Sequence, residues 1–144
     1  MNKENIYEII KYLGTKRRAS VFCERIEIIL RESEGIAMDS AIVSELTSEE
    51  IEMISKLYTD KSELRASLLQ LASEIRKTES MRILVARRPS WLYQQKLLKT
   101  LQNAIKEQFF IEIEERTTLI AGAIIEFKGK RKDFSLKSKL GTIT

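Results

Sequence analysis

The chain has 144 residues, of which 43% are hydrophobic and 32% are charged, with a net charge of +4 and no histidine. That length suits one domain or two very small ones. Without histidine the commonest general base and metal ligand are missing, and one cysteine and five glycines provide neither a zinc cluster nor a phosphate-binding loop. The composition therefore argues against an enzyme, and it predicts no catalytic residue, no cofactor and no metal site.

Charge is distributed unevenly along the chain. Residues 1–80 hold 12 basic and 15 acidic side chains, a net charge of −3, whereas residues 81–144 hold 13 and 6, a net charge of +7. An acidic first half and a basic second half suggest two faces or two partners. No apolar run is long enough to span a bilayer, and the N-terminus lacks the apolar core of a signal peptide, which argues against export. Cys23, beside Val21 and Phe22, is expected to be a buried structural thiol in a reducing compartment.

The first 80 residues are predicted to form a bundle of three or four helices. Apolar residues recur at helical spacing from residue 5 to about residue 30, with an interruption at Gly14, and Gly35 is expected to end the second helix. Residues 36–46 fit a short helix or an irregular connection. Thr47 and Glu50 have the spacing of a capping box, which predicts a helix start. A later helical stripe consists of Leu64, Leu68, Leu71 and Ile75. This stripe is expected to be a seam of the bundle, or alternatively a surface that receives a foreign amphipathic helix.

The hydrophobic period changes near residues 78–80, and the second half is predicted to be a small α/β domain. Residues 81–86 form a strand-like run that ends before Pro89, and Ser90 is expected to cap the helix that follows. Residues 109–114 alternate as a half-buried strand does, and residues 119–127 supply a third strand with Gly122 inside it, as a close contact or a bulge.

The order strand, helix, strand, strand, short helix predicts one small sheet with helical cover. The fold class is therefore α+β. A helical bundle over residues 1–79 is followed by an α/β domain over residues 80–144.

Two basic and aromatic clusters contain the candidate partner-binding residues. The denser cluster consists of Lys128, Lys130, Arg131 and Lys132, with Phe127 and Phe134 on its flanks. It is interpreted as a solvated hairpin turn around Gly129 that can contact an acidic partner, in preference to a nucleic-acid-binding patch. Trp91 follows Arg87 and Arg88 and begins a helix. It is either a core residue or a partner anchor, and core burial is the favoured expectation.

The C-terminal part of the chain resembles the delta subunit of F-type ATP synthases, the oligomycin sensitivity-conferring protein of mitochondria. Members carry Leu-Ile-Gly-Gly followed by apolar residues, then Asp-Gly-Ser and a short segment that ends in leucine. The matching residues here are Leu119, Ile120, Gly122, Asp133, Ser135 and Leu140. Ala121 and Phe134 replace two glycines of the pattern. Asp133 or Ser135 is expected to cap a last short helix over residues 136–140. The first half is shorter than the six-helix bundle of the family and carries no residue match.

This resemblance implies a non-catalytic stator subunit. In the family, the N-terminal bundle grips N-terminal segments of the alpha subunits of the catalytic head, and the C-terminal part meets the end of the b-subunit peripheral stalk. The stator resists the torque of rotation and lets proton flow drive ATP synthesis. The resemblance thus implies alpha and b-type subunits as partners and no small-molecule substrate. It also implies a location at the cytoplasmic face of the membrane, reached only through the complex.

Two alternatives stay open. One is the stalk subunit of a V/A-type ATPase, although that family has a long charged N-terminal helix that this chain lacks. The other is a small RNA- or DNA-binding module that uses the basic second half, whose affinity would fall steeply with rising salt.

Overall fold

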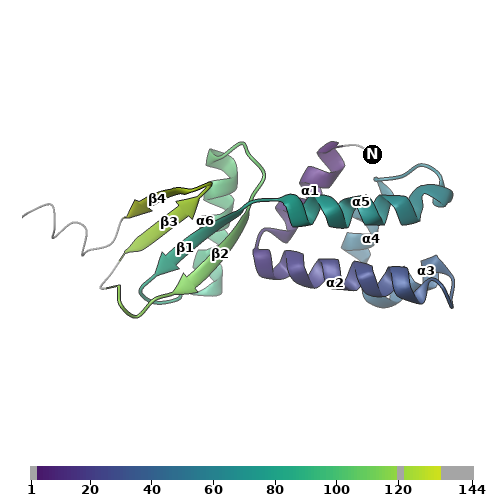
Figure 1. Cartoon of the computed structure of the whole chain (residues 1–144), viewed down its shortest axis with the longest axis horizontal. Helices are drawn as coiled ribbons and strands as arrows, with labels where there is room; N and C mark the ends of the chain where they lie inside the picture. Colours follow the sequence, from purple (N-terminus) through teal and green to yellow (C-terminus); the bar gives the residue numbers. More distant parts are fainter. Residues whose placement is uncertain (1–2, 120–121, 134–144) are drawn as a thin grey trace, which may run out of the picture. The chain divides into compact units, whose positions relative to one another are not determined.

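The computed structural model describes residues 3–119 and 122–133, and the chain divides into two compact units. The first unit comprises Met1–Leu13 and Arg17–Thr78, and the second comprises Gly14–Lys16 and Glu79–Thr144. The fold class is α+β, as predicted, because α-helices precede a four-stranded sheet that is covered by one further helix (Figure 1).

The described part of the first unit contains five α-helices. They are α1 (Lys3–Leu13), α2 (Lys16–Glu32), α3 (Met38–Glu45), α4 (Ser48–Ser55) and α5 (Leu64–Lys77), with a 3₁₀ turn at Lys61–Glu63 before α5. This is one helix more than the upper prediction, because the ambiguous residues 36–46 form α3. The predicted stripes build the core, in which Ile26, Leu68 and Leu71 are fully buried.

Local sequence signals in the first unit act as predicted. Thr47 Oγ1 accepts a hydrogen bond from the Glu50 N–H at 3.2 Å, and Glu50 Oε1 accepts one from the Thr47 N–H at 2.9 Å. The capping box is therefore confirmed. The predicted seam of the bundle is buried at all four of its residues, Leu64, Leu68, Leu71 and Ile75. Cys23 is buried as well, and this burial raises the pKa of its thiol, as expected for a structural cysteine.

The second unit is a mixed sheet with strand order β2-β1-β3-β4, and α6 lies across one of its faces (Figure 1). Its elements are β1 (Ser80–Val85), α6 (Trp91–Ala104), β2 (Phe110–Glu115), β3 (Ala123–Phe127) and β4 (Lys130–Asp133). β1 pairs in parallel with β2 through the α6 crossover and antiparallel with β3, which forms a hairpin with β4. Ser90 caps α6 as predicted, because its Oγ accepts a hydrogen bond from the Tyr93 N–H at 3.3 Å.

Alternation along the strands gives the sheet two different faces. The face beneath α6 is apolar, and its buried cluster consists of Met81, Ile83, Leu98, Phe109 and Ile111. Between Met81 and Ile83, Arg82 points to the opposite face, which carries charged residues from all four strands. The sheet therefore holds α6 on one side by apolar burial and presents ion pairs on the other.

The structure differs from the sequence-based expectation at three places near the end of the described chain. The third strand begins at Ala123 and not at Leu119, because Thr117 and Thr118 form a turn in which the Leu119 N–H donates to the Arg116 carbonyl at 3.1 Å. Gly122 lies before this strand and not inside it, with a φ of +84°, a left-handed value that favours glycine. Residues 130–133 form a fourth strand, because all four of them pair with residues 124–127 of β3. The expected helix over residues 136–140 lies outside the described residues.

Gly14 allows its own backbone to lie close to helix α6 in the second unit. Its φ is +68°, and a Cβ at this position would overlap the Leu98 Cδ2 atom of α6. The Gly14 carbonyl accepts a hydrogen bond from the Ile111 N–H at 2.9 Å, and Thr15 forms a parallel bridge with Ile111. Lys16 then pairs with Glu112 at 3.7 Å. The segment Gly14–Lys16 thus continues the sheet beside β2.

We expect Gly14→Ala to lower the free energy of unfolding by about 1–3 kcal/mol, because alanine must adopt a left-handed φ and displace Leu98. The matched control is Gly35→Ala, since Gly35 has no left-handed φ and an added Cβ lies 3.9 Å from the nearest atom, the Glu32 carbonyl oxygen. The control should change stability by less than about 0.5 kcal/mol. Urea denaturation followed by circular dichroism measures both, and equal losses would contradict this account of Gly14.

Candidate functional site

The β3–β4 hairpin carries the basic cluster of residues 128–132. Its turn consists of Lys128 and Gly129, whose φ values of 50° and 76° are the left-handed values of a two-residue hairpin turn. The predicted hairpin turn around Gly129 is therefore confirmed. Lys130, Arg131 and Lys132 lie on β4, at one edge of the sheet. Strand pairing thus fixes the backbone of most of the cluster, which the sequence analysis assigned to the turn itself.

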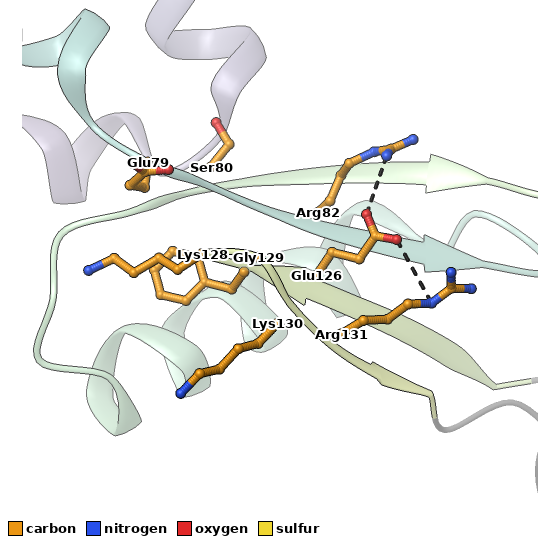
Figure 2. A pocket seen from close by; sticks show the side chains of 9 residues that line it. Glu79, Ser80, Arg82, Glu126, Lys128, Gly129, Lys130 and Arg131 are labelled. Carbon is orange, nitrogen blue, oxygen red and sulfur yellow. Dashed lines mark hydrogen bonds and ion pairs between the residues drawn. The ribbon is translucent and has the colours of Figure 1, made fainter.

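A shallow groove of about 490 Å³ lies along this hairpin and the start of β1. Figure 2 shows Arg82, Glu126 and Arg131 in a row across the strands, whereas Lys128 and Lys130 extend away from that row. Lys128 forms an ion pair with Glu107 and lies 5.6 Å from the centre of the Phe127 ring. Lys130 forms no ion pair with any described residue and is exposed. The groove therefore combines partly neutralised cations with one lysine that is available to an acidic partner.

Arg82 is the centre of the row of ion pairs. Its Nε lies 3.1 Å from Glu114 Oε2, and its Nη1 lies 3.3 Å from Glu126 Oε2. Glu126 Oε1 in turn lies 3.9 Å from the Arg131 Nε. The hydrogen bond between Arg82 and Glu114 raises the pKa of the guanidinium and lowers the pKa of the carboxyl. The row joins four strands, and because opposite charges alternate along it, it adds little net charge to this face.

The ion pair between Arg82 and Glu114 makes stability depend on pH. Because the fold lowers the pKa of Glu114 below its ordinary value of 4.5, the pair stabilises the protein fully above that value. This stabilisation is lost as the pH falls through the lowered pKa. We expect Arg82→Met to be less stable than the wild type at about pH 7, and we expect this difference to be smaller at about pH 3, below the ordinary pKa of a glutamate.

Urea denaturation at the two pH values measures this change in the difference. The control is Arg87→Met, because Arg87 is exposed and forms no ion pair with a described residue. A difference between wild type and Arg82→Met that is the same at both pH values would contradict the role of Glu114.

Trp91 is exposed, so the expectation of core burial was wrong. Its exposed fraction is 72%, and those of Leu92 and Tyr93 are 60% and 58%. The reason is that α6 packs on the sheet through Leu98, with partial contributions from Leu97 and Leu101, all in later turns of the helix. No residue of the first turn of α6 belongs to the apolar cluster beneath the helix. Three consecutive large apolar side chains therefore face solvent.

The two predicted clusters do not form one site. The β1–β3 register pairs Val85 with Ala123 and Arg82 with Glu126, so the hairpin turn lies beside the start of β1. α6 begins after the end of β1 and returns over the sheet for 14 residues, which corresponds to about 20 Å. Trp91 and the hairpin turn therefore lie at opposite ends of the same sheet.

The residues of the family pattern are only partly within the described chain. Leu119 is half-buried after the turn, Gly122 precedes β3, and Asp133 ends β4 opposite Ile124. The remaining pattern residues Ile120, Ser135 and Leu140, together with Phe134, lie outside the described residues. Sequence reasoning did not identify Arg82, Glu114 or Glu126; the available signal was the presence of charged residues within three otherwise apolar predicted strands.

Residues 3–119 and 122–133 contain no group of three His, Cys, Asp or Glu side chains that could hold a metal ion. No helix in that part of the chain is long and apolar enough to cross a membrane. The prominent features of the second unit are instead an exposed aromatic turn and a basic edge strand. Surfaces of these kinds are typical of subunits that bind other proteins.

Comparison with protein families identifies the class of this subunit. The family model "ATP synthase delta (OSCP) subunit" matches residues 58–144, more than half of the chain, and this region contains both candidate clusters. The chain therefore belongs to the ATP synthase delta (OSCP) family, whose members are subunits of the peripheral stalk of F-type ATP synthases, and the resemblance seen in the sequence is confirmed. A comparison with curated proteins finds no match.

Proposed function

We propose that this chain is the stator subunit that links the catalytic head of a rotary F-type ATP synthase to its peripheral stalk. The family match supports this proposal, because members of the family are structural subunits of that stalk. In this role the protein carries out no reaction. It resists the torque of rotation at the cytoplasmic face of the membrane, where the complex holds it, and so supports ATP synthesis driven by proton flow.

The observation that carries the proposal is the exposed first turn of α6, within the matched region. Trp91 and Tyr93 are residue types that often anchor protein interfaces, and both are more than half exposed. Residues 86–106 contain no acidic side chain, and Lys96 and Lys99 are exposed farther along α6. An amphipathic partner helix with acidic flanks matches this arrangement. We therefore assign the C-terminal end of a b-type stalk subunit to the second unit.

The basic hairpin supplies a second contact for the same stalk helix. Lys130 pairs with Phe127, and Lys132 pairs with Ile125, so both lysines leave the sheet on the face that α6 covers. A partner helix that lies along α6 would pass from Trp91 toward the hairpin, and the separation of about 20 Å corresponds to roughly four helical turns. The distance between the clusters thus favours an elongated partner.

The helical unit is the proposed binding partner of the catalytic head. α5 buries its seam and presents Leu69 on the outside with 53% exposure. An apolar side chain at this position suits an amphipathic N-terminal segment of an alpha subunit. The stator would then hold the head with one unit and the stalk with the other.

The nucleic-acid alternative is less well supported. Binding of single strands combines cations with aromatic rings that stack on bases. Here Trp91 lies at the other end of the sheet from the hairpin, and Lys128 is already paired with Glu107. The hairpin, which holds the densest basic cluster, thus lies away from the exposed aromatic rings of α6.

We expect Trp91→Ala to weaken binding to the soluble part of the b-type subunit by about 30-fold, because a central aromatic anchor contributes about 2 kcal/mol or more. Isothermal titration calorimetry with the full chain measures this change. The matched control is Val43→Ala, since Val43 is equally exposed, at 71%, on a helix of the other unit. The control should bind within about twofold of wild type. Equal affinity of Trp91→Ala and wild type, or no binding of wild type to the b-type subunit, would contradict the proposal.

A further inference from the structure

A second groove, of about 300 Å³, lies within the helical unit. It is bounded by the end of α1, the first half of α2 and the start of α4, and none of its lining residues comes from α5. Its floor is apolar, because Leu13 and Phe22 are buried there and Val21 is 39% exposed. This groove is therefore separate from the surface of Leu69 and from both clusters of the second unit.

Arginines surround the apolar floor. Arg17, Val21 and Arg25 are spaced four residues apart along α2, which places them on one face of the helix, with the valine between the two cations. Arg18 adds a third guanidinium on the side of α1. Residues 1–80 carry a net charge of −3. The positive groove is therefore a local feature and not a consequence of a basic background.

Internal contacts already orient two of these arginines. The Arg18 Cζ lies 4.8 Å above the centre of the Tyr12 ring. The Arg25 Nη1 lies 3.7 Å from Glu50 Oε1, the atom that also accepts the capping hydrogen bond from Thr47. Glu50 is only 5% exposed and is the one acidic residue of the lining. The lining of the groove thus carries more positive than negative charge. Guanidinium groups that are already held in place lose little side-chain entropy when they bind an anion.

The side chains that line the groove favour some kinds of anion over others. An apolar floor offers nothing to a phosphate group, whereas it can bury an aliphatic side chain. Base stacking needs an open aromatic face, but Arg18 lies over the Tyr12 ring. A carboxylate fits the planar fork of an arginine through two parallel hydrogen bonds. These features favour a peptide that carries carboxylates beside an apolar residue.

We infer that this groove binds an acidic amphipathic segment of a partner protein. An apolar side chain of that segment rests on Val21, and its carboxylates pair with Arg17 and Arg25. The inference does not depend on the stator proposal, because none of the groove residues belongs to the proposed head contact at Leu69 or to the second unit.

The test uses a fluorescein-labelled, acetylated and amidated peptide of glutamate pairs separated by leucines, and the same peptide with glutamine for glutamate. We expect the acidic peptide to bind the full chain and to shift the amide NMR signals of the first half of α2 and of Thr47. The glutamine peptide should bind about tenfold more weakly, because it lacks the carboxylates.

Two matched variants locate the binding. Arg17→Glu should weaken the acidic peptide about tenfold in fluorescence anisotropy. It should fold, because Arg17 is exposed and an acidic residue is favourable in the first turn of a helix. Arg31→Glu makes the same charge change in the last turn of α2, outside the groove, and should bind within about twofold of wild type. The inference is wrong if both variants weaken binding equally, if the NMR shifts fall elsewhere, or if a single-stranded oligonucleotide of equal charge binds the groove more tightly.

Discussion

The left-handed backbone at Gly14 determines how the second unit is assembled. Because Gly14 has no Cβ, Leu98 of α6 occupies the space where a side chain would lie. Leu98 is also the one buried residue of α6 within the apolar cluster on the sheet. The same glycine accepts a backbone hydrogen bond from Ile111 of β2. One position without a side chain therefore joins the sheet edge to the helix that covers it.

This arrangement also determines which surfaces remain for partners. Since α6 is anchored through its later turns, its first turn stays exposed and presents Trp91, Leu92 and Tyr93. At the other end of the sheet, the β3–β4 turn presents cations from a paired strand. On the face opposite α6, the ion pairs of Arg82 connect neighbouring strands and leave little unbalanced charge. In the proposed stator, a rigid sheet thus separates two contacts that an elongated stalk helix could engage together.

The sequence predicted those features that depend on near neighbours. Thr47 with Glu50 and Ser90 with Tyr93 lie within one helical turn of each other, and the turn at Lys128 and Gly129 depends on two adjacent residues. Features that depend on distant partners escaped prediction. Gly14 is separated from Leu98 by most of the chain, so its left-handed φ looked like a simple helix interruption. Trp91 was assigned to the core because large aromatic residues are usually buried, but where α6 touches the sheet depends on packing that helical periodicity does not specify.

The central claim is that this protein works as part of an ATP synthase, and affinity purification from native membranes tests it most directly. The full chain would carry an affinity tag, and mass spectrometry would identify the proteins retained with it. The stator account predicts recovery of the alpha, beta and b-type subunits of the ATP synthase. Recovery of nucleic acid or ribosomal proteins without any ATP synthase subunit would contradict it, and the basic second half would then have to be explained as a nucleic-acid surface.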